Sequence, residues 1–171
     1  MTILFITENK EWIPFLVQKS KRKEIIPMIK IKKLTTTATI PTKGSKYSAG
    51  YDLYADNQNE IYVLPHTTVK IHTGLAFMLP ENTAGFIFAR SGVATKRGLR
   101  PANAVGVVDS DYRGEVIVAL HNDTNDLQVI LPYERIAQLV VMPYCLDKLQ
   151  EVDELDKTER GTGGFGSTGT N

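Results

Sequence analysis

The chain has 171 residues, of which 42% are apolar, and its 20 basic and 19 acidic side chains nearly cancel. This length predicts a single domain with a substantial core, and the charge balance argues against the broad positive field of a nucleic-acid-binding protein. Cys145 is the only cysteine, which excludes an internal disulfide and a cysteine-based zinc site. We expect Cys145 to be a small buried residue.

Residues 1–27 differ in composition from the rest of the chain, and we expect them to form a flexible, partly helical extension. The apolar run 3–6 is followed at once by polar and charged residues, so it is too short for a secretory signal. No run approaches the ~20 apolar residues of a membrane span, so we expect no membrane association. Because the charges nearly balance, we also expect no nucleic-acid binding. We expect a cytoplasmic protein, although the basic run 19–23 leaves another compartment open.

From residue 28 onward the pattern is typical of β-structure. Apolar and other residues alternate over 29–32 and 69–79, which is the period of half-buried strands. Further short apolar runs lie at 61–64, 85–88, 105–108, 116–120, 129–131 and 136–142. Prolines separate many of these runs, and only residues 93–97 look able to form a helical turn. Many short strands without a sustained helical period predict an all-β sandwich or barrel.

The most distinctive stretch is 104–115, with the sequence AVGVVDSDYRGE. It places Asp109, Asp111, Tyr112 and Arg113 between two apolar runs, which predicts a hairpin with polar side chains at its bend. An alternative is an ordinary turn in which Asp and Ser bond to their own backbone.

Five segments in this order resemble the five sequence motifs of the trimeric dUTPases. They are SAGYDLYA at 48–55, RSG at 90–92, AVGVVDSDYRGE at 104–115, RIAQL at 135–139 and RGTGGFGSTG at 160–169. The resemblance covers residues 28–171. It implies a jelly-roll-like β-barrel that forms a homotrimer with active sites shared between subunits. We expect the barrel core to span 28–155 and a mobile glycine-rich arm, 156–171, to close over the active site.

The resemblance implies that the protein hydrolyses dUTP to dUMP and pyrophosphate, which keeps uracil out of DNA and supplies dUMP for dTMP synthesis. Two alternatives stay open. One is a dCTP deaminase, which shares this fold but needs a catalytic Glu and lacks the arm. The other is a non-catalytic nucleotide-sensing jelly roll, which would be expected to have lost Asp109 or the arm.

Asp109 matches the family's catalytic Asp, which implies that it holds and deprotonates the water that attacks the α-phosphorus. Asp111 would point to the other face of a strand, so we expect it to be a structural acceptor. The family uses hydrated Mg²⁺, which keeps most of its waters and takes phosphate oxygens as ligands. Asp52 resembles the family Asp that holds this ion through water, although it could instead cap a turn. His66, His72 and His121 show no ligand spacing, and we expect them to be ordinary surface or core residues.

The remaining site residues also follow from the resemblance. Tyr112 would lie against the deoxyribose and exclude a 2′-hydroxyl, and Asn103 would contact the base through its amide. Uracil would be read by the backbone of Gly106, Val107, Val108 and Ile117. Arg90, Ser91, Gly92 and Gln138 would bind phosphate, although Arg90 could instead make a structural ion pair. Arg135 is expected to be structural. In the arm, Phe165 would stack over uracil, Arg160 and Ser167 would reach the terminal phosphate, and glycines such as Gly166 would let the backbone wrap the ligand.

Three short segments depart from the family pattern. Ala89 stands where Pro is usual, Tyr133-Glu134 stands where Gly-Asp is common, and 98–101 differs from the usual connection. These positions lie in turns and supporting contacts, so we expect them to affect loop geometry and rates more than the reaction.

Overall fold

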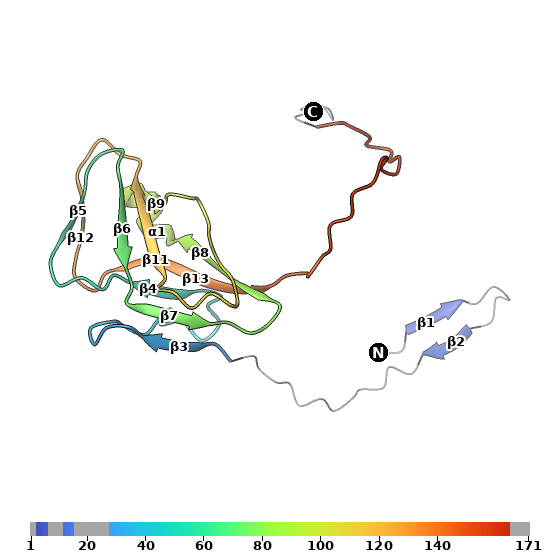
Figure 1. The fold of residues 1–171 in the computed structure, drawn as a ribbon, viewed down its shortest axis with the longest axis horizontal. Helices are drawn as coiled ribbons and strands as arrows, with labels where there is room; N and C mark the ends of the chain where they lie inside the picture. Colours follow the sequence, from blue (N-terminus) through green and yellow to red (C-terminus); the bar gives the residue numbers. More distant parts are fainter. Residues whose placement is uncertain (1–2, 7–11, 16–27, 165–171) are drawn as a thin grey trace.

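The computed structural model describes residues 3–6, 12–15 and 28–164, and these ranges are nearly all β-structure (Figure 1). They contain thirteen strands and one short helix. In chain order these are β1 (Ile3–Ile6), β2 (Trp12–Phe15), β3 (Lys30–Lys33), β4 (Tyr51–Tyr54), β5 (Ile61–Val63), β6 (Thr68–His72), β7 (Leu75–Met78), β8 (Thr83–Ala89), α1 (Ser91–Arg97), β9 (Leu99–Pro101), β10 (Gly106–Val108), β11 (Ile117–Asn122), β12 (Gln128–Ile130) and β13 (Arg135–Pro143). The all-β fold predicted from the sequence is confirmed, as is the single helical turn.

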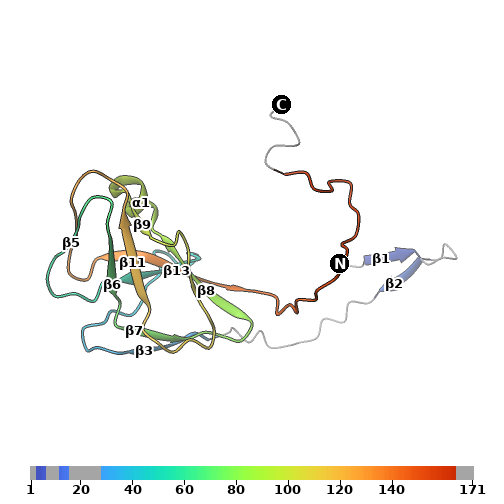
Figure 2. The same ribbon diagram turned by 45° about the horizontal axis from the view of Figure 1, so that its top comes forward.

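The strands of residues 30–143 form small antiparallel sheets around one core (Figure 2). The largest has the order β10-β8-β13-β4, and the others are β6-β11-β9, β12-β5 and β3-β7. Leu53, Ile71, Leu75, Leu120 and Ile136 are fully buried and come from five different strands. Burying each such side chain contributes about 1.5–3 kcal/mol, so the core holds the sheets together as one jelly-roll-like barrel.

The alternating run 69–79 is split into two strands by a tight turn at Thr73 and Gly74. Gly74 has φ +64, and a Cβ there would lie 2.4 Å from Oδ2 of Asp56. Only glycine fits such a place without strain. Thr73 is fully buried, and its hydroxyl donates a hydrogen bond to the carbonyl of Val116 at 2.6 Å. This turn therefore anchors the segment that follows β10.

The hairpin predicted around 104–120 is not formed as a pair of strands. β10 pairs with β8, whereas β11 pairs with β6 and β9. The stretch 109–116 therefore connects two different sheets. The apolar runs were identified correctly, but their partners lie far away in the sequence, where local patterning cannot identify them.

The N-terminal residues that the structure describes are strands. β1 and β2 pair antiparallel, with Ile3 opposite Phe15 and Ile6 opposite Trp12. The expectation of a partly helical extension is therefore wrong for 3–6 and 12–15. The basic run 19–23 lies outside the described residues.

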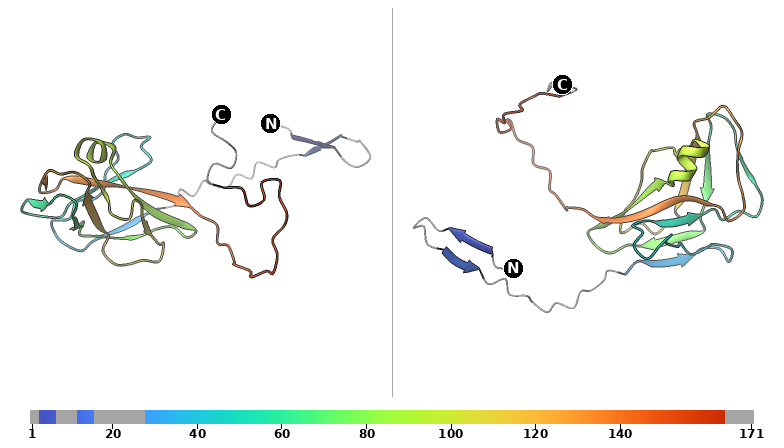
Figure 3. Two further views of the ribbon diagram at one scale, coloured as in Figure 1. Left: turned by 90° about the horizontal axis from the view of Figure 1, so that it is seen from above. Right: turned by 180° about the vertical axis from the view of Figure 1, so that it is seen from behind.

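After β13, residues 144–164 run away from the barrel without a strand or helix (Figure 3). Cys145 is exposed in this segment, so the prediction that it is buried is wrong, because the chain leaves the core at the end of β13. Within the described ranges, no helix is long and apolar enough to cross a membrane.

Candidate functional site

A cavity of about 300 Å³ lies beside β10 and the loop that follows it. We call it the Asp109 pocket. It brings together seven residues predicted to bind substrate or catalyse the reaction, namely Asn103, Gly106, Val107, Val108, Asp109, Tyr112 and Ile117. Sequence reasoning missed Ile87, Glu115 and Val116, which complete the lining. A Cβ at Gly106 would lie 3.2 Å from Cβ of Ile87, so β10 and β8 approach closely at this wall.

Asp109 is exposed and lines this pocket. No side-chain hydrogen bond joins its carboxylate to the other residues that the structure describes, so both oxygens are available to a ligand or water. Asp111 is also exposed and does not line the pocket. No hydrogen bond to the Asp111 carboxylate is found within 28–164 either, so the expected role as a structural acceptor gains no support.

Glu115 lines the Asp109 pocket, and its carboxylate makes two contacts. Its Oε1 accepts a hydrogen bond from the backbone N–H of Gly74 at 2.8 Å, and its Oε2 lies 2.8 Å from Nδ1 of His72. Both partners belong to β6 or to the turn before β7, so the carboxylate ties the loop to a neighbouring sheet. His72 is thus a surface residue with a structural contact, as the sequence suggested.

A second cavity, of about 510 Å³, holds residues of three other motifs. We call it the Arg90 pocket. Its lining includes Ser48, Ala49, Gly50, Asp52, Arg90, Ser91, Gly92, Arg135 and Gln138. The predicted phosphate-binding residues and the predicted metal-holding carboxylate therefore lie together. The pocket presents two cations and one anion among these residues, which suits an anionic ligand.

Asp52 organises the charges of the Arg90 pocket. Its Oδ1 accepts a hydrogen bond from Nε of Arg90 at 2.8 Å, and its Oδ2 accepts one from Nη1 of Arg135 at 3.3 Å. The Asp52 side chain is only 14% exposed. Arg135 forms an ion pair with Asp52 and also lines this pocket, so its structural role stays a prediction. On the neighbouring strand, Nε2 of Gln138 donates to the carbonyl of Ala89 at 2.9 Å, which leaves its second N–H available.

The described residues contain no group of three or more side chains of the His, Cys, Asp and Glu types that could hold a metal. These residues therefore provide no cluster of side chains that could ligate a metal directly. Asp52 suits binding of a metal through water. Each of its oxygens accepts one hydrogen bond, from Arg90 or Arg135, and keeps a lone pair for a metal-bound water.

The two pockets are separate cavities that both adjoin β8. Val108, next to Asp109, pairs with Gly85 near the start of β8, whereas Arg90 follows the last residue of that strand. Five residues of extended chain separate Gly85 from Arg90, which is about 17 Å. The pockets share no lining residue. Within one chain, Asp109 and Arg90 therefore line different cavities.

Arg160 lines neither pocket. It is exposed, and its Nε donates a hydrogen bond to the nearby carbonyl of Gly163 at 3.0 Å. Figure 3 shows this segment leading away from the barrel. The other predicted arm residues, Phe165, Gly166 and Ser167, lie outside the described residues.

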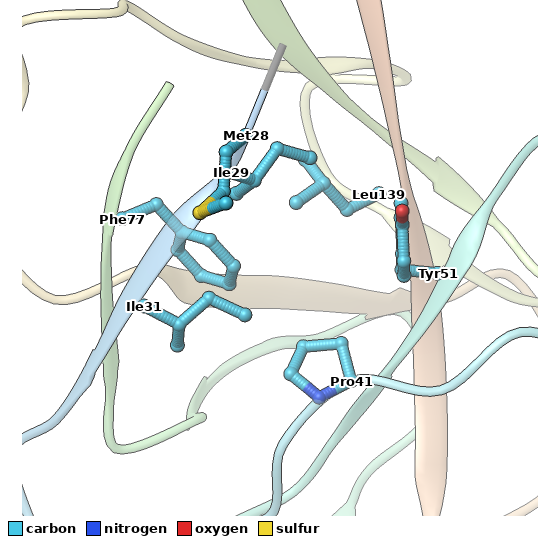
Figure 4. Close-up of a pocket in the computed structure, with 7 residues that line it drawn as sticks. All are labelled: Met28, Ile29, Ile31, Pro41, Tyr51, Phe77 and Leu139. Carbon is cyan, nitrogen blue, oxygen red and sulfur yellow. The ribbon is translucent and has the colours of Figure 1, made fainter. Parts of the chain in front are cut away.

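A third cavity, of about 360 Å³, is apolar (Figure 4). It is lined by Met28, Ile29, Ile31, Pro41, Tyr51, Phe77 and Leu139. No charged side chain and no predicted site residue lines it. An anionic ligand would lose its hydration there without compensation, so this cavity is not the candidate active site.

The departure at Tyr133-Glu134 has a structural counterpart. Tyr133 has φ +58, in the region that glycine adopts most easily. Glu134 forms an ion pair with Arg97 at the end of α1. Its Oε2 accepts a hydrogen bond from the backbone N–H of Leu131 at 2.9 Å. Because α1 begins at Ser91, this ion pair ties the Arg90 pocket to the turn before β13.

Comparison with known proteins agrees with these features. The family model described as dUTPase matches residues 36–169. A deoxyuridine 5′-triphosphate nucleotidohydrolase from Desulfitobacterium hafniense is 48% identical over 131 residues, covering 76% of this chain and 87% of the relative. The corresponding protein of Nautilia profundicola is 45% identical over 141 residues, covering 82% and 98%.

Solved structures agree as well. A Staphylococcus bacteriophage 80alpha dUTPase with a G164S substitution (in its own numbering), bound to dUpNHpp, superposes with a TM-score of 0.76 at 28% identity. The superposition covers 84% of this chain and 99% of the phage protein. The pocket residues, the all-β fold and the family match lead to one conclusion: this chain belongs to the dUTPase family, whose reaction is the hydrolysis of dUTP to dUMP.

Proposed function

We propose that Asp109 is the general base of this hydrolysis. Its carboxylate takes a proton from a water molecule while the water oxygen forms a bond to the α-phosphorus. The bond between that phosphorus and the bridging oxygen to the β-phosphate breaks, and pyrophosphate leaves with the electron pair. The observation that carries this proposal is the exposed Asp109 carboxylate, which accepts no hydrogen bond from the residues that the structure describes and lines a cavity together with Tyr112 and Asn103.

The Asp109 pocket is proposed to take the uracil and deoxyribose. The backbone of Gly106, Val107, Val108 and Ile117 reads the base edge, and the Asn103 amide supplies a donor and an acceptor. Gly106 and Ile87 approach each other closely. We infer that this limits the space beside the base and disfavours a 5-methyl group on it. Tyr112 forms the wall beside the sugar and excludes a 2′-hydroxyl by its bulk.

The Arg90 pocket is proposed to take the phosphates. Arg90 neutralises phosphate charge, and Ser91, Gly92 and Gln138 contribute polar groups of the same pocket. Mg²⁺, when bound to the substrate, would withdraw charge from the phosphate oxygens and help pyrophosphate leave. Asp52 would hold that ion through water, as its remaining lone pairs allow.

We propose that the active unit is a homotrimer in which sites are shared. In support of this, the residues of the Asp109 pocket and those of the Arg90 pocket form two separate cavities of one chain. In the proposed trimer, Asp109 of one chain works with Arg90 of another. The arm, 156–171, is proposed to close a site away from its own barrel, with Arg160 and Ser167 on the terminal phosphate and Phe165 over the base.

The product dUMP would serve dTMP synthesis, and removal of dUTP would keep uracil out of DNA. Both roles act on free nucleotides, and the nearly neutral chain needs no nucleic-acid partner. A cytoplasmic location is our expectation, with the N-terminal basic run as the feature that could change it.

A substrate panel tests this function. The protein is incubated with Mg²⁺ and, separately, dUTP, dCTP, dTTP or UTP, and pyrophosphate and ammonia are both measured. We expect rapid pyrophosphate release from dUTP alone and no ammonia. Ammonia from dCTP would instead indicate the deaminase, and binding of dUTP without turnover would indicate a nucleotide sensor.

A further inference from the structure

We propose that Gly114 is a positioning residue that sets the sugar selectivity of the enzyme by seating the ring of Tyr112. The inference rests on the proposed role of Tyr112 as the wall beside the deoxyribose. It adds a second residue to that selectivity, one that contacts no substrate. We define the Tyr112 seat as Gly114 together with the backbone carbonyl of Glu115.

The ring of Tyr112 lies directly over the α-carbon of Gly114. A Cβ at position 114 would lie 2.3 Å from Oη, 2.5 Å from Cζ and 3.0 Å from Cε2 of that ring. No side chain larger than hydrogen fits there while the ring keeps its place. Gly114 is not among the positive-φ glycines of the described chain, which are Gly74, Gly98 and Gly161. The requirement at 114 is therefore for space and not for an unusual backbone.

The second contact of the seat holds the hydroxyl. Oη of Tyr112 donates a hydrogen bond to the carbonyl of Glu115 at 3.2 Å. The Glu115 carboxylate is itself fixed by the N–H of Gly74 and by Nδ1 of His72, each at 2.8 Å. In the next residue, the N–H of Val116 donates to the carbonyl of Leu75 at 2.8 Å. The seat is thus anchored to the β6–β7 turn and does not move freely with the loop.

Alanine at 114 would push the ring off its seat. The ring cannot move toward Glu115, which is held in place, but Tyr112 is 47% exposed and its outer side is open. We therefore expect the ring to swing outward and leave room beside the sugar. A 2′-hydroxyl would then fit, so UTP would become a better substrate while dUTP still binds.

Four proteins test this: wild type, Gly114→Ala, Tyr112→Ala and the double variant. For each, kcat/KM is measured with dUTP and with UTP, and thermal unfolding checks that the chain is folded. We expect the dUTP-to-UTP ratio of kcat/KM to fall about tenfold or more in Gly114→Ala, as for the loss of a steric contact in a pocket. General damage to the fold would lower both values together and leave the ratio unchanged.

The double variant is the matched control. If Gly114 acts only through the ring, adding Gly114→Ala to Tyr112→Ala changes the ratio by less than about twofold. A further large fall would show that Gly114 acts in another way and would overturn the proposal. If the dUTP-to-UTP ratio falls in Tyr112→Ala but is unchanged in folded Gly114→Ala, the role of Gly114 is overturned and the role of Tyr112 stands. An unchanged ratio in Tyr112→Ala would show that Tyr112 does not exclude the 2′-hydroxyl, and the proposal would fall with it.

Tyr112→Phe tests the seat without changing residue 114, in case Gly114→Ala does not fold. The variant keeps the ring and removes the hydrogen bond to the Glu115 carbonyl. We expect the ratio to fall about threefold, in keeping with one half-exposed hydrogen bond. A ratio equal to that of wild type would overturn the seat's second contact.

Discussion

The carboxylate of Asp52 on β4 accepts a hydrogen bond from Nε of Arg90, at 2.8 Å, across the intervening strand β13. This contact fixes the direction of a guanidinium that would otherwise have many rotamers. It also balances part of the positive charge in the Arg90 pocket, so that the arginine is oriented before phosphate arrives.

Asp52→Asn should therefore lower kcat/KM for dUTP by about tenfold, because the amide keeps the shape and loses a charge-assisted hydrogen bond. Steady-state kinetics measures this. Asp123→Asn is the control, since Asp123 forms a bidentate pair with Arg100, at 2.7 and 3.0 Å, outside both pockets. We expect it to retain activity within about twofold. Equal activity of the two variants would refute the orienting role of Asp52.

Asp109→Asn should reduce kcat by 10²–10⁴-fold and leave dUTP binding nearly intact, because the amide cannot accept the proton of water. Single-turnover kinetics and equilibrium binding separate the two effects. Asp111→Asn, also exposed but outside the pocket, should change kcat only a few-fold. If Asp109→Asn kept more than about a tenth of the wild-type kcat, another group would be the base.

Mixed oligomers test the shared site. Asp109→Asn has a sound arm, and a truncation ending at Glu159 has a sound base, so each should be nearly inactive alone. Co-expressed so that their chains mix, they should recover a fraction of wild-type activity, because some sites would combine Asp109 of one chain with the arm of another. Replacing the truncation by Arg90→Ala tests in the same way whether Asp109 and Arg90 of one site come from different chains.

Purified single-variant oligomers, mixed after assembly without exchange, are the control and should stay inactive. Verified mixed trimers that stayed as inactive as their parents would place the base and the arm on one chain. The same result with Arg90→Ala would place Asp109 and Arg90 of one active site on the same chain.

Removal of residues 1–27 should leave assembly and activity within about threefold of the full chain, since all five motifs follow residue 28. Among the described strands, β1 and β2 pair only with each other. Size-exclusion chromatography with dUTP turnover measures the outcome. An insoluble or inactive truncation would show that the extension is part of the fold.

Tyr133→Gly should stabilise the protein slightly, by about 0.5 kcal/mol. The left-handed backbone at φ +58 costs a non-glycine residue roughly 1–2 kcal/mol. Glycine removes this cost, but it loses more conformational entropy on folding, which costs about 0.5–1 kcal/mol. Denaturant unfolding at matched protein concentration measures it. Tyr144→Gly is the control, because Tyr144 is similarly exposed and has no positive φ, so it should gain nothing. A loss above about 1 kcal/mol in Tyr133→Gly would mean that the ring packs usefully.

The sequence by itself determined the β-class and the extent of most strands, and it supplied the candidate site residues. Alternation at 29–32 and short apolar runs such as 136–142 are local patterns, and a strand's period of two is written into consecutive residues. The five motifs are also local, which is why Asp109, Tyr112 and Arg90 could be chosen before any coordinates. Their grouping into two pockets follows motif membership, with Asn103 and the 104–117 segment in one and the Asp52, Arg90 and Gln138 motifs in the other.

Only the tertiary structure decided which strands pair and what stands between the motifs. The choice of β8 as partner of β10 depends on contacts between residues about 20 apart in sequence, and the same apolar run would suit other partners. The exposure of Cys145, the contact of Glu115 with Gly74 and the place of the Tyr112 ring over Gly114 likewise depend on three-dimensional packing. So does the placement of Asp109 and Arg90 in two cavities that share no lining residue, because it depends on how distant strands pair.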